Sequence, residues 1–271
     1  MNIDFFSNKQ NLLIQYKQTN KQTNTMNAIC LITLRPNEIW CDFLNAFSGS
    51  IYKLFVVVDD NTFDLSAFKD KFENICFIQI ENVQCKLTGF VDTSFTLNKL
   101  ISGWDKALCY FATLEEQEQP PFIWFLEDDV YLCNESTIAN IDAAHTDEDL
   151  LSNKCYTNID GNKNSWHWKR IQINHPPPYH CGMMCVVRIS RKMLQCIREY
   201  ADNNGTLYFL EALFPTIAAK NNLKHLDALH AFTNVTYRNT FADEDINDCD
   251  FFHPVKDMRR HLFLRQLQTQ K

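Results

Sequence analysis

Apolar residues along the chain fall into two patterns that alternate. Several short runs are apolar at nearly every position, which is typical of strands buried on both faces of a parallel sheet. The main predicted strands are residues 28–34, 52–58, 75–80, 122–126 and 181–189, and shorter strand-like stretches are residues 154–158 and 231–237.

Between these runs, apolar residues recur every three or four positions, as on the buried face of a helix. Trp40, Leu44 and Phe47 show this spacing in the first such segment. Strands that alternate with helices predict an α/β fold with a mostly parallel central sheet flanked by helices. The predicted helices are residues 38–47, 64–72, 95–114, 136–144, 191–200 and 207–220.

The patterned part of the chain contains no visible linker or internal repeat. We therefore predict one domain at residues 26–256, followed by a basic helix at residues 257–271. Residues 1–25 are rich in Asn, Gln and Lys, and their apolar pieces are too short for the core of a signal peptide. We interpret them as a polar extension.

Composition excludes some classes of function. The formal net charge is −7, so no basic surplus indicates a nucleic-acid partner. No apolar run approaches the roughly 20 residues that a membrane span requires. The chain has 11 cysteines, many of them inside apolar runs, where a free thiol behaves as a small apolar group. Without a secretion signal, we expect reduced thiols in a cytoplasmic protein.

Acidic residues stand where two predicted strands end. The fourth run ends in Glu127, Asp128 and Asp129, and the second ends in Asp59 and Asp60. The carboxyl ends of parallel strands meet at one edge of a sheet, where α/β proteins bind ligands. Adjacent carboxylates repel one another unless a cation holds them, and a hard divalent cation is the simplest partner. A solvated acidic turn is the alternative interpretation.

Residues 160–180 are the least regular part of the chain and carry several aromatic side chains, including Trp166, Trp168 and Tyr179. A long loop in a compact domain is usually functional or disordered. Aromatic rings on such a loop suit stacking on sugar rings, but ordinary packing beneath the loop explains them equally well.

The predicted helix 207–220 is apolar on all sides except at Glu211. A helix that is apolar all round is buried, so this carboxylate needs a partner or a function. Burial raises the pKa of a carboxyl group toward the range that suits a general base. A salt bridge to a core cation such as Arg188 is the alternative.

With these residues in hand, the chain resembles the metal-dependent glycosyltransferases of the GT-A fold, a Rossmann-like α/β fold. Glu127-Asp128-Asp129 stands where that family has an Asp-x-Asp motif, and Cys181-Gly182-Met183-Met184 is similar to its glycine-containing segment. Glu211 matches an acid near the start of the following helix, and His253 matches a late histidine. Two departures are the Glu in place of the first Asp, and Ala212 where a second acid is usual.

The resemblance implies transfer of a sugar from a nucleoside-diphosphate donor, such as a UDP-sugar, to a hydroxyl of a glycan or glycoprotein acceptor. It implies Mn²⁺ or Mg²⁺ as cofactor, Asp129 and His253 as metal ligands, and Glu211 as catalytic base of an inverting reaction. The residues that it places at the nucleotide sugar and its metal are Thr33, Arg35, Asp59, Asp60, Glu127, Asp128, Gly182 and Lys256.

Two other functions stay open at this stage. The same fold could bind nucleotide sugars or glycans without catalysis. A metal-dependent phosphoryl-transfer enzyme also places acids after a buried strand, but such chemistry typically starts from an Asp nucleophile in Asp-x-Asp. Here the first acid is Glu127, and no Walker-type glycine loop is present.

Overall fold

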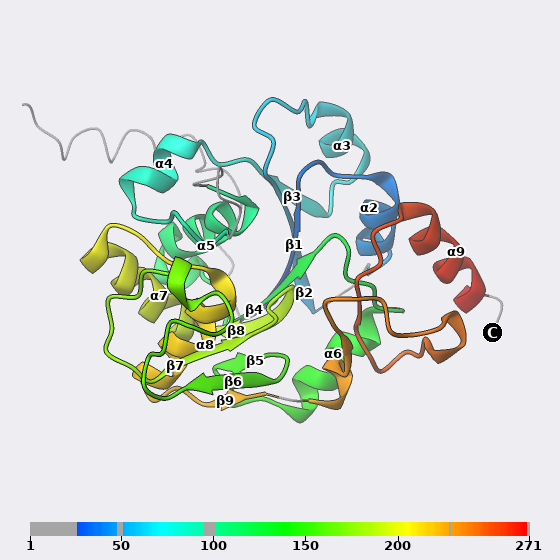
Figure 1. Ribbon diagram of the computed structural model, residues 1–271. Helices are drawn as coiled ribbons and strands as arrows, with labels where there is room; N and C mark the ends of the chain where they lie inside the picture. Colours follow the sequence, from blue (N-terminus) through cyan, green and yellow to red (C-terminus); the bar gives the residue numbers. More distant parts are fainter. Residues whose placement is uncertain (1–25, 48–50, 95–100, 228, 270–271) are drawn as a thin grey trace, which may run out of the picture.

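A computed structural model describes residues 26–47, 51–94, 101–227 and 229–269 (Figure 1). Its centre is a seven-stranded sheet of order β3-β2-β1-β4-β8-β5-β9. β1 to β4 are parallel, and β8 runs antiparallel to both β4 and β5. The predicted α/β class with a mostly parallel sheet is therefore confirmed. The strands are β1 (Asn27–Thr33), β2 (Tyr52–Val58), β3 (Ile75–Ile78), β4 (Phe122–Glu127), β5 (Leu150–Leu151), β8 (Val186–Ser190) and β9 (His225–Leu226).

Helices cover both faces of the sheet. In Figure 1, α4, α5, α7 and α8 lie on one side, and α2, α3, α6 and α9 lie on the other. The helices are α2 (Glu38–Asn45), α3 (Ser66–Lys71), α4 (Asn82–Leu87), α5 (Gly103–Thr113), α6 (Glu135–Ala144), α7 (Arg191–Asn204), α8 (Leu210–Lys220) and α9 (Met258–Thr269). Two small sheets join β6 (Cys155–Asn158) to β7 (Tyr179–Gly182) and β10 (Asn234–Val235) to β11 (Phe252–His253).

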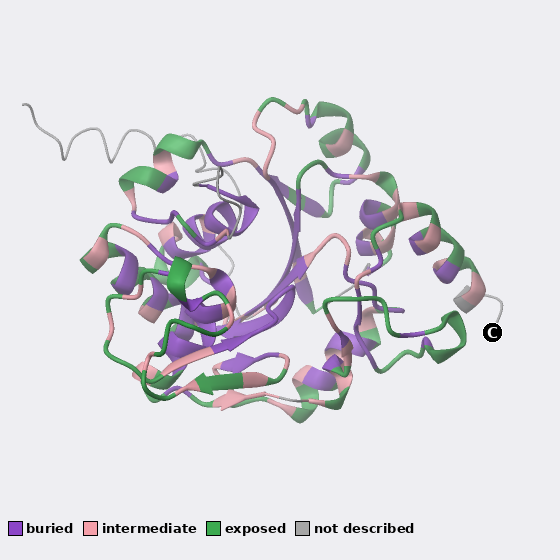
Figure 2. Cartoon of the chain, viewed as in Figure 1, coloured by how far each residue is buried: buried purple, intermediate pink, exposed green. Residues whose placement is uncertain are grey.

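This two-sided cover explains the continuous apolar runs in the sequence. Successive residues of a strand point to opposite faces. In β1, Ala28 and Cys30 belong to the apolar core shared with α5, α7 and α8, whereas Ile29 and Leu31 belong to the core shared with α2 and α6. All four side chains are fully buried, as are most residues of the central strands (Figure 2). A strand buried on both faces has no position for a polar side chain until it ends.

The strand order reverses between β1 and β4, because the chain moves outward through β2 and β3 and then returns to the other side of β1. Ligands of open α/β sheets bind beside the carboxyl ends of strands at such a switch point. The backbone N–H of Asp59 donates to the carbonyl of Thr33 at 2.9 Å, so the ends of β1 and β2 meet there. The polar strand ends therefore share one edge of the sheet, as predicted.

Three predicted strands have different partners or bounds. The segment 181–189 is not one strand, because β7 ends at Gly182 and β8 begins at Val186. The residues between them carry the chain from the small sheet to the large one. The stretch 154–158 does form a strand, but it pairs with β7 rather than with the central sheet. Of the stretch 231–237, only Asn234–Val235 is a strand.

Two predicted helices begin later than their apolar pattern indicates. α5 begins at Gly103, because the Ser102 side chain and the Asp105 carboxylate form a capping box there. The earlier part of that prediction, residues 95–100, lies outside the described residues, as does the predicted extension 1–25. The predicted helix 38–47 is described and ends earlier, at Asn45. α8 begins at Leu210, whose N–H bonds to the carbonyl of Thr93 at 3.0 Å.

The start of α8 changes the position of Glu211. The sequence pattern predicted this residue inside a buried helix, but it lies in the first turn and is only partly buried. Leu207 is outside the helix, since its N–H bonds to the carbonyl of Val91. The predicted helix interior at Glu211 is therefore wrong. The short elements α4, β5, β9 and β11 (Phe252–His253) were not predicted from the sequence, since each has little periodicity.

The N-cap of α7 allows a test of how much one capping side chain contributes to stability. Ser190 is its N-cap: the hydroxyl accepts from the N–H of Met193 at 3.0 Å and donates to Asp149 at 2.7 Å. We expect Ser190→Ala to lower the free energy of unfolding by about 0.5–2 kcal/mol, because it leaves a helix N–H without its acceptor. Urea denaturation measures this, with Ser165→Ala as an exposed control expected to stay within about 0.5 kcal/mol. Equal midpoints for both variants would show that the cap contributes nothing.

Candidate functional site

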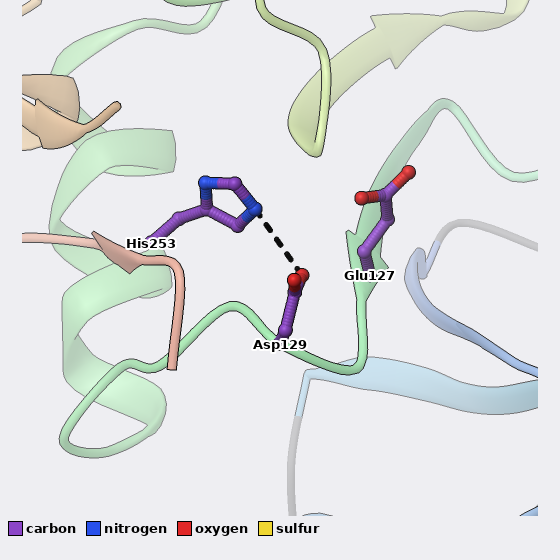
Figure 3. A group of neighbouring side chains, drawn as sticks. All are labelled: Glu127, Asp129 and His253. Carbon is purple, nitrogen blue, oxygen red and sulfur yellow. Dashed lines mark ion pairs between the residues drawn. The ribbon is translucent and has the colours of Figure 1, made fainter. Parts of the chain in front are cut away.

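Three side chains that can bind a metal ion gather at the carboxyl end of β4. Glu127 is the last residue of that strand, Asp129 follows two residues later, and His253 comes from β11. One ligand atom from each lies within 4.8 Å of the others (Figure 3). Within the described ranges, this is the one such group of three or more His, Cys, Asp or Glu side chains. We call it the metal cluster.

His253 is oriented by its second ring nitrogen. Nδ1 lies 2.7 Å from the carbonyl oxygen of Thr236 and donates to it, which leaves Nε2 directed at Asp129 at 3.3 Å. Such a hydrogen bond fixes the tautomer of a metal-binding histidine. Asp129 is held from the other side, because its carbonyl accepts from the N–H of Val255 at 2.7 Å. The two predicted metal ligands therefore lie together.

The environment of the acidic residues disfavours their negative charge. Burial raises the pKa of Glu127, and the charges of Asp129 and Asp128 add to this, although the hydrogen bond from Trp104 opposes it. Burial also raises the pKa of Asp128, again with a contribution from Asp129. A cation placed among these groups would reverse both effects. Two carboxylates and one imidazole form a donor set that suits Mn²⁺, since carboxylates favour it and imidazole is tolerated.

Asp128 and Thr33 join the ends of β4 and β1. The Thr33 hydroxyl donates to the Asp128 carboxylate at 2.5 Å. The indole of Trp40 donates to the carbonyl of Asp128 at 2.8 Å. This pairing directs the Asp128 carboxylate toward β1, whereas Asp129 turns toward His253 in Figure 3. The three consecutive acids therefore do not act as one group.

The two acids after β2 have cationic partners. The ammonium of Lys106, from α5, lies 3.1 Å from the Asp59 carboxylate and 2.9 Å from Asn61 Oδ1, and it also contacts the carbonyl of Asp59. Arg35 binds the Asp60 carboxylate through two nitrogens, each at 2.7 Å. Hydrogen bonds from Thr62 and Arg35 lower the pKa of Asp60 to about 2.

Two further predicted site residues are Gly182 and Lys256. Gly182 ends β7, and a Cβ there would lie 2.8 Å from Cys155 Sγ and 2.9 Å from the carbonyl oxygen of Lys154. The glycine therefore permits the close approach of β6 and β7. Lys256 is exposed and directly follows Val255, the residue that bonds to Asp129.

Glu211 lies near the metal cluster and accepts a hydrogen bond from the Tyr237 hydroxyl at 3.0 Å. Burial raises its pKa to about 7; the Tyr237 hydrogen bond opposes this shift, whereas the charge of Glu127 adds to it. The alternative partner, Arg188, instead forms a buried ion pair with Asp142 at 2.7 Å. Glu211 therefore has the protonation range that a general base needs near neutral pH.

Three residues of this site were not singled out from the sequence. Trp104, from α5, donates its indole N–H to Glu127 at 2.6 Å. Thr236 and Tyr237 are consecutive, and the first holds His253 while the second holds Glu211. Thr236 and Tyr237 belong to a segment predicted as a strand, and nothing in its sequence distinguishes them from their neighbours. Only the tertiary contacts identify them.

Two properties of the whole described chain bear on the sequence predictions. All eleven cysteines lie in the described residues, and none of them forms a disulfide there. Among the helices of the described part, none combines the length and the apolar character needed to cross a membrane.

Comparisons with known proteins add little to this picture. No protein-family model matches the chain, and neither does any curated protein sequence. Among solved structures, it is similar to 4-diphosphocytidyl-2C-methyl-D-erythritol synthase from Anaerococcus prevotii, over 91% of this chain and 97% of that one. The identity is 11% and the TM-score is 0.45, so this likeness carries no argument about activity.

Proposed function

We propose that this protein is a metal-dependent glycosyltransferase that moves a sugar from a nucleoside-diphosphate donor to an acceptor hydroxyl. One observation carries the proposal: a carboxylate with a pKa of about 7, Glu211, lies beside a cluster of Glu127, Asp129 and His253 that can bind a divalent cation. The cluster stands at the carboxyl end of β4, beside the switch point of the sheet, where α/β proteins bind ligands. Metal-dependent glycosyl transfer with inversion uses these two features together.

In this proposal, Asp129, His253 and Glu127 hold Mn²⁺ or Mg²⁺. When bound, the cation offsets the negative charge on the departing diphosphate. Trp104 and Thr236 orient two of the ligands through the hydrogen bonds at 2.6 and 2.7 Å. Such outer contacts typically change metal affinity by about 10–100-fold.

The donor nucleotide would occupy the ends of β1, β2 and β4. Asp128 and Thr33 form one wall of this region, and the Asp60–Arg35 pair forms the other. The Asp59 carboxylate is held by its ion pair with Lys106. We therefore assign Asp59 to shaping the nucleotide region and to one contact with the nucleoside. Lys256 supplies a positive charge for the diphosphate, and we assign Gly182, at the end of β7, to the side of the site that faces the sugar.

Glu211 is the proposed catalytic base. It takes the proton of the acceptor hydroxyl while that oxygen forms a bond to the anomeric carbon and the bond from this carbon to the diphosphate oxygen breaks. The base and the leaving group then act from opposite sides of the sugar, which gives inversion. Tyr237 keeps the carboxylate directed through its hydrogen bond.

A thermal-shift screen of nucleoside-diphosphate sugars, each with Mn²⁺, tests the donor. The matching donor at 100 times its dissociation constant should raise the apparent stability by about 2.7 kcal/mol. Because the proposed contacts to the diphosphate run through the cation, the same donor in EDTA should give a much smaller shift. A shift that is equal with and without EDTA would contradict the metal-dependent site.

The chemistry is tested separately from binding. Incubation with the matching donor, Mn²⁺ and acceptors should release the nucleoside diphosphate. Binding without any release would favour a non-catalytic nucleotide-sugar protein. Release of phosphate from an aryl phosphate, or of pyrophosphate from a nucleoside triphosphate, would replace glycosyl transfer by phosphoryl or nucleotidyl transfer.

A further inference from the structure

A large cleft lies next to the metal cluster and Glu211. Its volume is about 990 Å³, at the upper end of the roughly 300–1,000 Å³ typical of ligand sites. Residues of β6, of the irregular loop 160–180, of β7 and of the segment around β10 line it. Neither the metal cluster nor the strand ends of β1 and β2 are among its lining residues, so it is distinct from the proposed nucleotide region.

The charge of the cleft excludes a phosphate-bearing ligand. Among its lining residues only Lys154 and Asp160 carry charge, and their signs are opposite. The ammonium of Lys154 lies 5.6 Å from the ring centroid of Tyr156, over the aromatic face. A diphosphate calls for several cationic groups or a ring of N–H donors. The cleft instead offers amide and hydroxyl groups, which suit an uncharged ligand rich in hydroxyls.

Aromatic faces form much of the wall. Tyr156 and Tyr237 line the cleft although 62% and 67% of their surfaces are exposed. Trp166 lines it as well and is braced by Phe209 at 5.8 Å and Trp168 at 4.7 Å between ring centroids. Large rings left exposed on a concave surface indicate a binding site. Trp168 itself is buried, so packing explains that residue of the loop.

The cleft opens onto the proposed catalytic groups. Tyr237 lines the cleft and donates a hydrogen bond to Glu211 at 3.0 Å. Thr236, which also lines the cleft, accepts from His253. A ligand lying along the aromatic wall therefore ends beside Glu211.

We propose that this cleft binds the acceptor and that the acceptor is an uncharged oligosaccharide of more than one sugar unit. Its rings stack on Tyr156 and Trp166, and its terminal hydroxyl lies against Glu211 next to Tyr237. The identification of this ligand as the acceptor rests on the proposed function. The binding of an uncharged oligosaccharide does not, since it is measured without donor or metal.

Saturation-transfer NMR and calorimetry test the binding, with malto-, cello- and chito-oligosaccharides of two to five units as probes. At least one series should bind more tightly than its monosaccharide. Tyr156→Ala should weaken that binding by about 3–10-fold, the range for one lost ring contact. Tyr156→Phe keeps the ring and should bind like the wild type. Phe263→Ala removes an exposed ring on α9, outside the cleft, and should also bind like the wild type.

Binding that is lost in Tyr156→Ala and restored in Tyr156→Phe supports the proposal. Failure of every uncharged oligosaccharide, or binding of only anionic glycans or peptides, overturns it while metal-dependent donor binding still stands. If oligosaccharides bind but no nucleotide sugar does, the cleft is a glycan site and the glycosyltransferase proposal fails instead.

Discussion

Replacing Glu211 with Gln is expected to lower the rate of sugar transfer by about 10²–10⁴-fold, the usual effect of removing a general base. The amide has nearly the same shape and can keep a hydrogen bond with Tyr237, but it cannot accept the acceptor's proton. Donor binding should stay close to that of the wild type, because the metal cluster and the nucleotide region are intact. Initial rates of transfer and donor dissociation constants from calorimetry measure the two quantities.

The pH dependence of transfer gives a second signature of the same residue. A base acts in its ionised form, and the pKa of Glu211 is about 7. The rate should therefore fall as the pH decreases below about 7, approaching tenfold for each further pH unit. The residual rate of the Glu211→Gln variant should lack this acidic limb, because the group that titrates is absent.

Glu199→Gln is the matched control, since it removes an exposed carboxylate from α7, away from the metal cluster. It should transfer sugar at the wild-type rate. If Glu211→Gln also keeps a near-normal rate, the base is another residue or the reaction is retaining. NMR assignment of the anomeric configuration of the product then separates these two explanations.

The sheet and its functional edge could be predicted because both depend on the same local pattern. A strand buried on both faces is apolar until it ends, so the change from Leu126 to Glu127 marks both the strand terminus and the ligand edge. The same holds at Val58 and Asp59. Parallel pairing then brings together residues that are about 70 positions apart in the chain. Their closeness could be predicted from the strand ends alone.

The contacts that orient the site could not be predicted in this way. Trp104 looks like any core residue of an amphipathic helix, and its ring does pack against Phe125 and Phe214. Its indole N–H reaches Glu127 because the packing of α5 against the sheet places Trp104 beside the end of β4. This placement depends on side-chain packing between elements, which periodicity does not encode.

The first residues of helices could not be predicted from the apolar pattern either. The apolar residues before Leu210 continue the helical pattern, but the backbone at Leu207 and Leu210 bonds to the segment 91–93 instead. This moves Glu211 from the interior of the helix to its first turn, where the carboxylate accepts a hydrogen bond from Tyr237. A local conflict between pattern and structure here coincides with the proposed catalytic residue, as is common at functional sites.

Asp129→Asn is expected to abolish the effect of metal on donor binding. The amide keeps an oxygen but loses the negative charge that attracts a hard cation, and Glu127 and His253 alone form an incomplete ligand set. Because outer contacts to a metal ligand already change affinity by about 10–100-fold, loss of a ligand should weaken Mn²⁺-dependent donor binding by more than that. Calorimetry of the donor with and without Mn²⁺ measures the difference directly.

Two controls separate loss of metal from loss of fold. Glu244→Gln removes one charge from an exposed acidic stretch outside the metal cluster and should leave donor binding unchanged. Asp129→Asn itself should still unfold cooperatively without metal, because the substitution relieves repulsion with Glu127 and Asp128. Wild-type protein in EDTA should then behave like the variant in Mn²⁺. If the variant binds donor as the wild type does, or if the wild type transfers sugar at full rate in EDTA, the metal cluster has no part in the reaction, and Glu211 would have to act in a metal-independent mechanism.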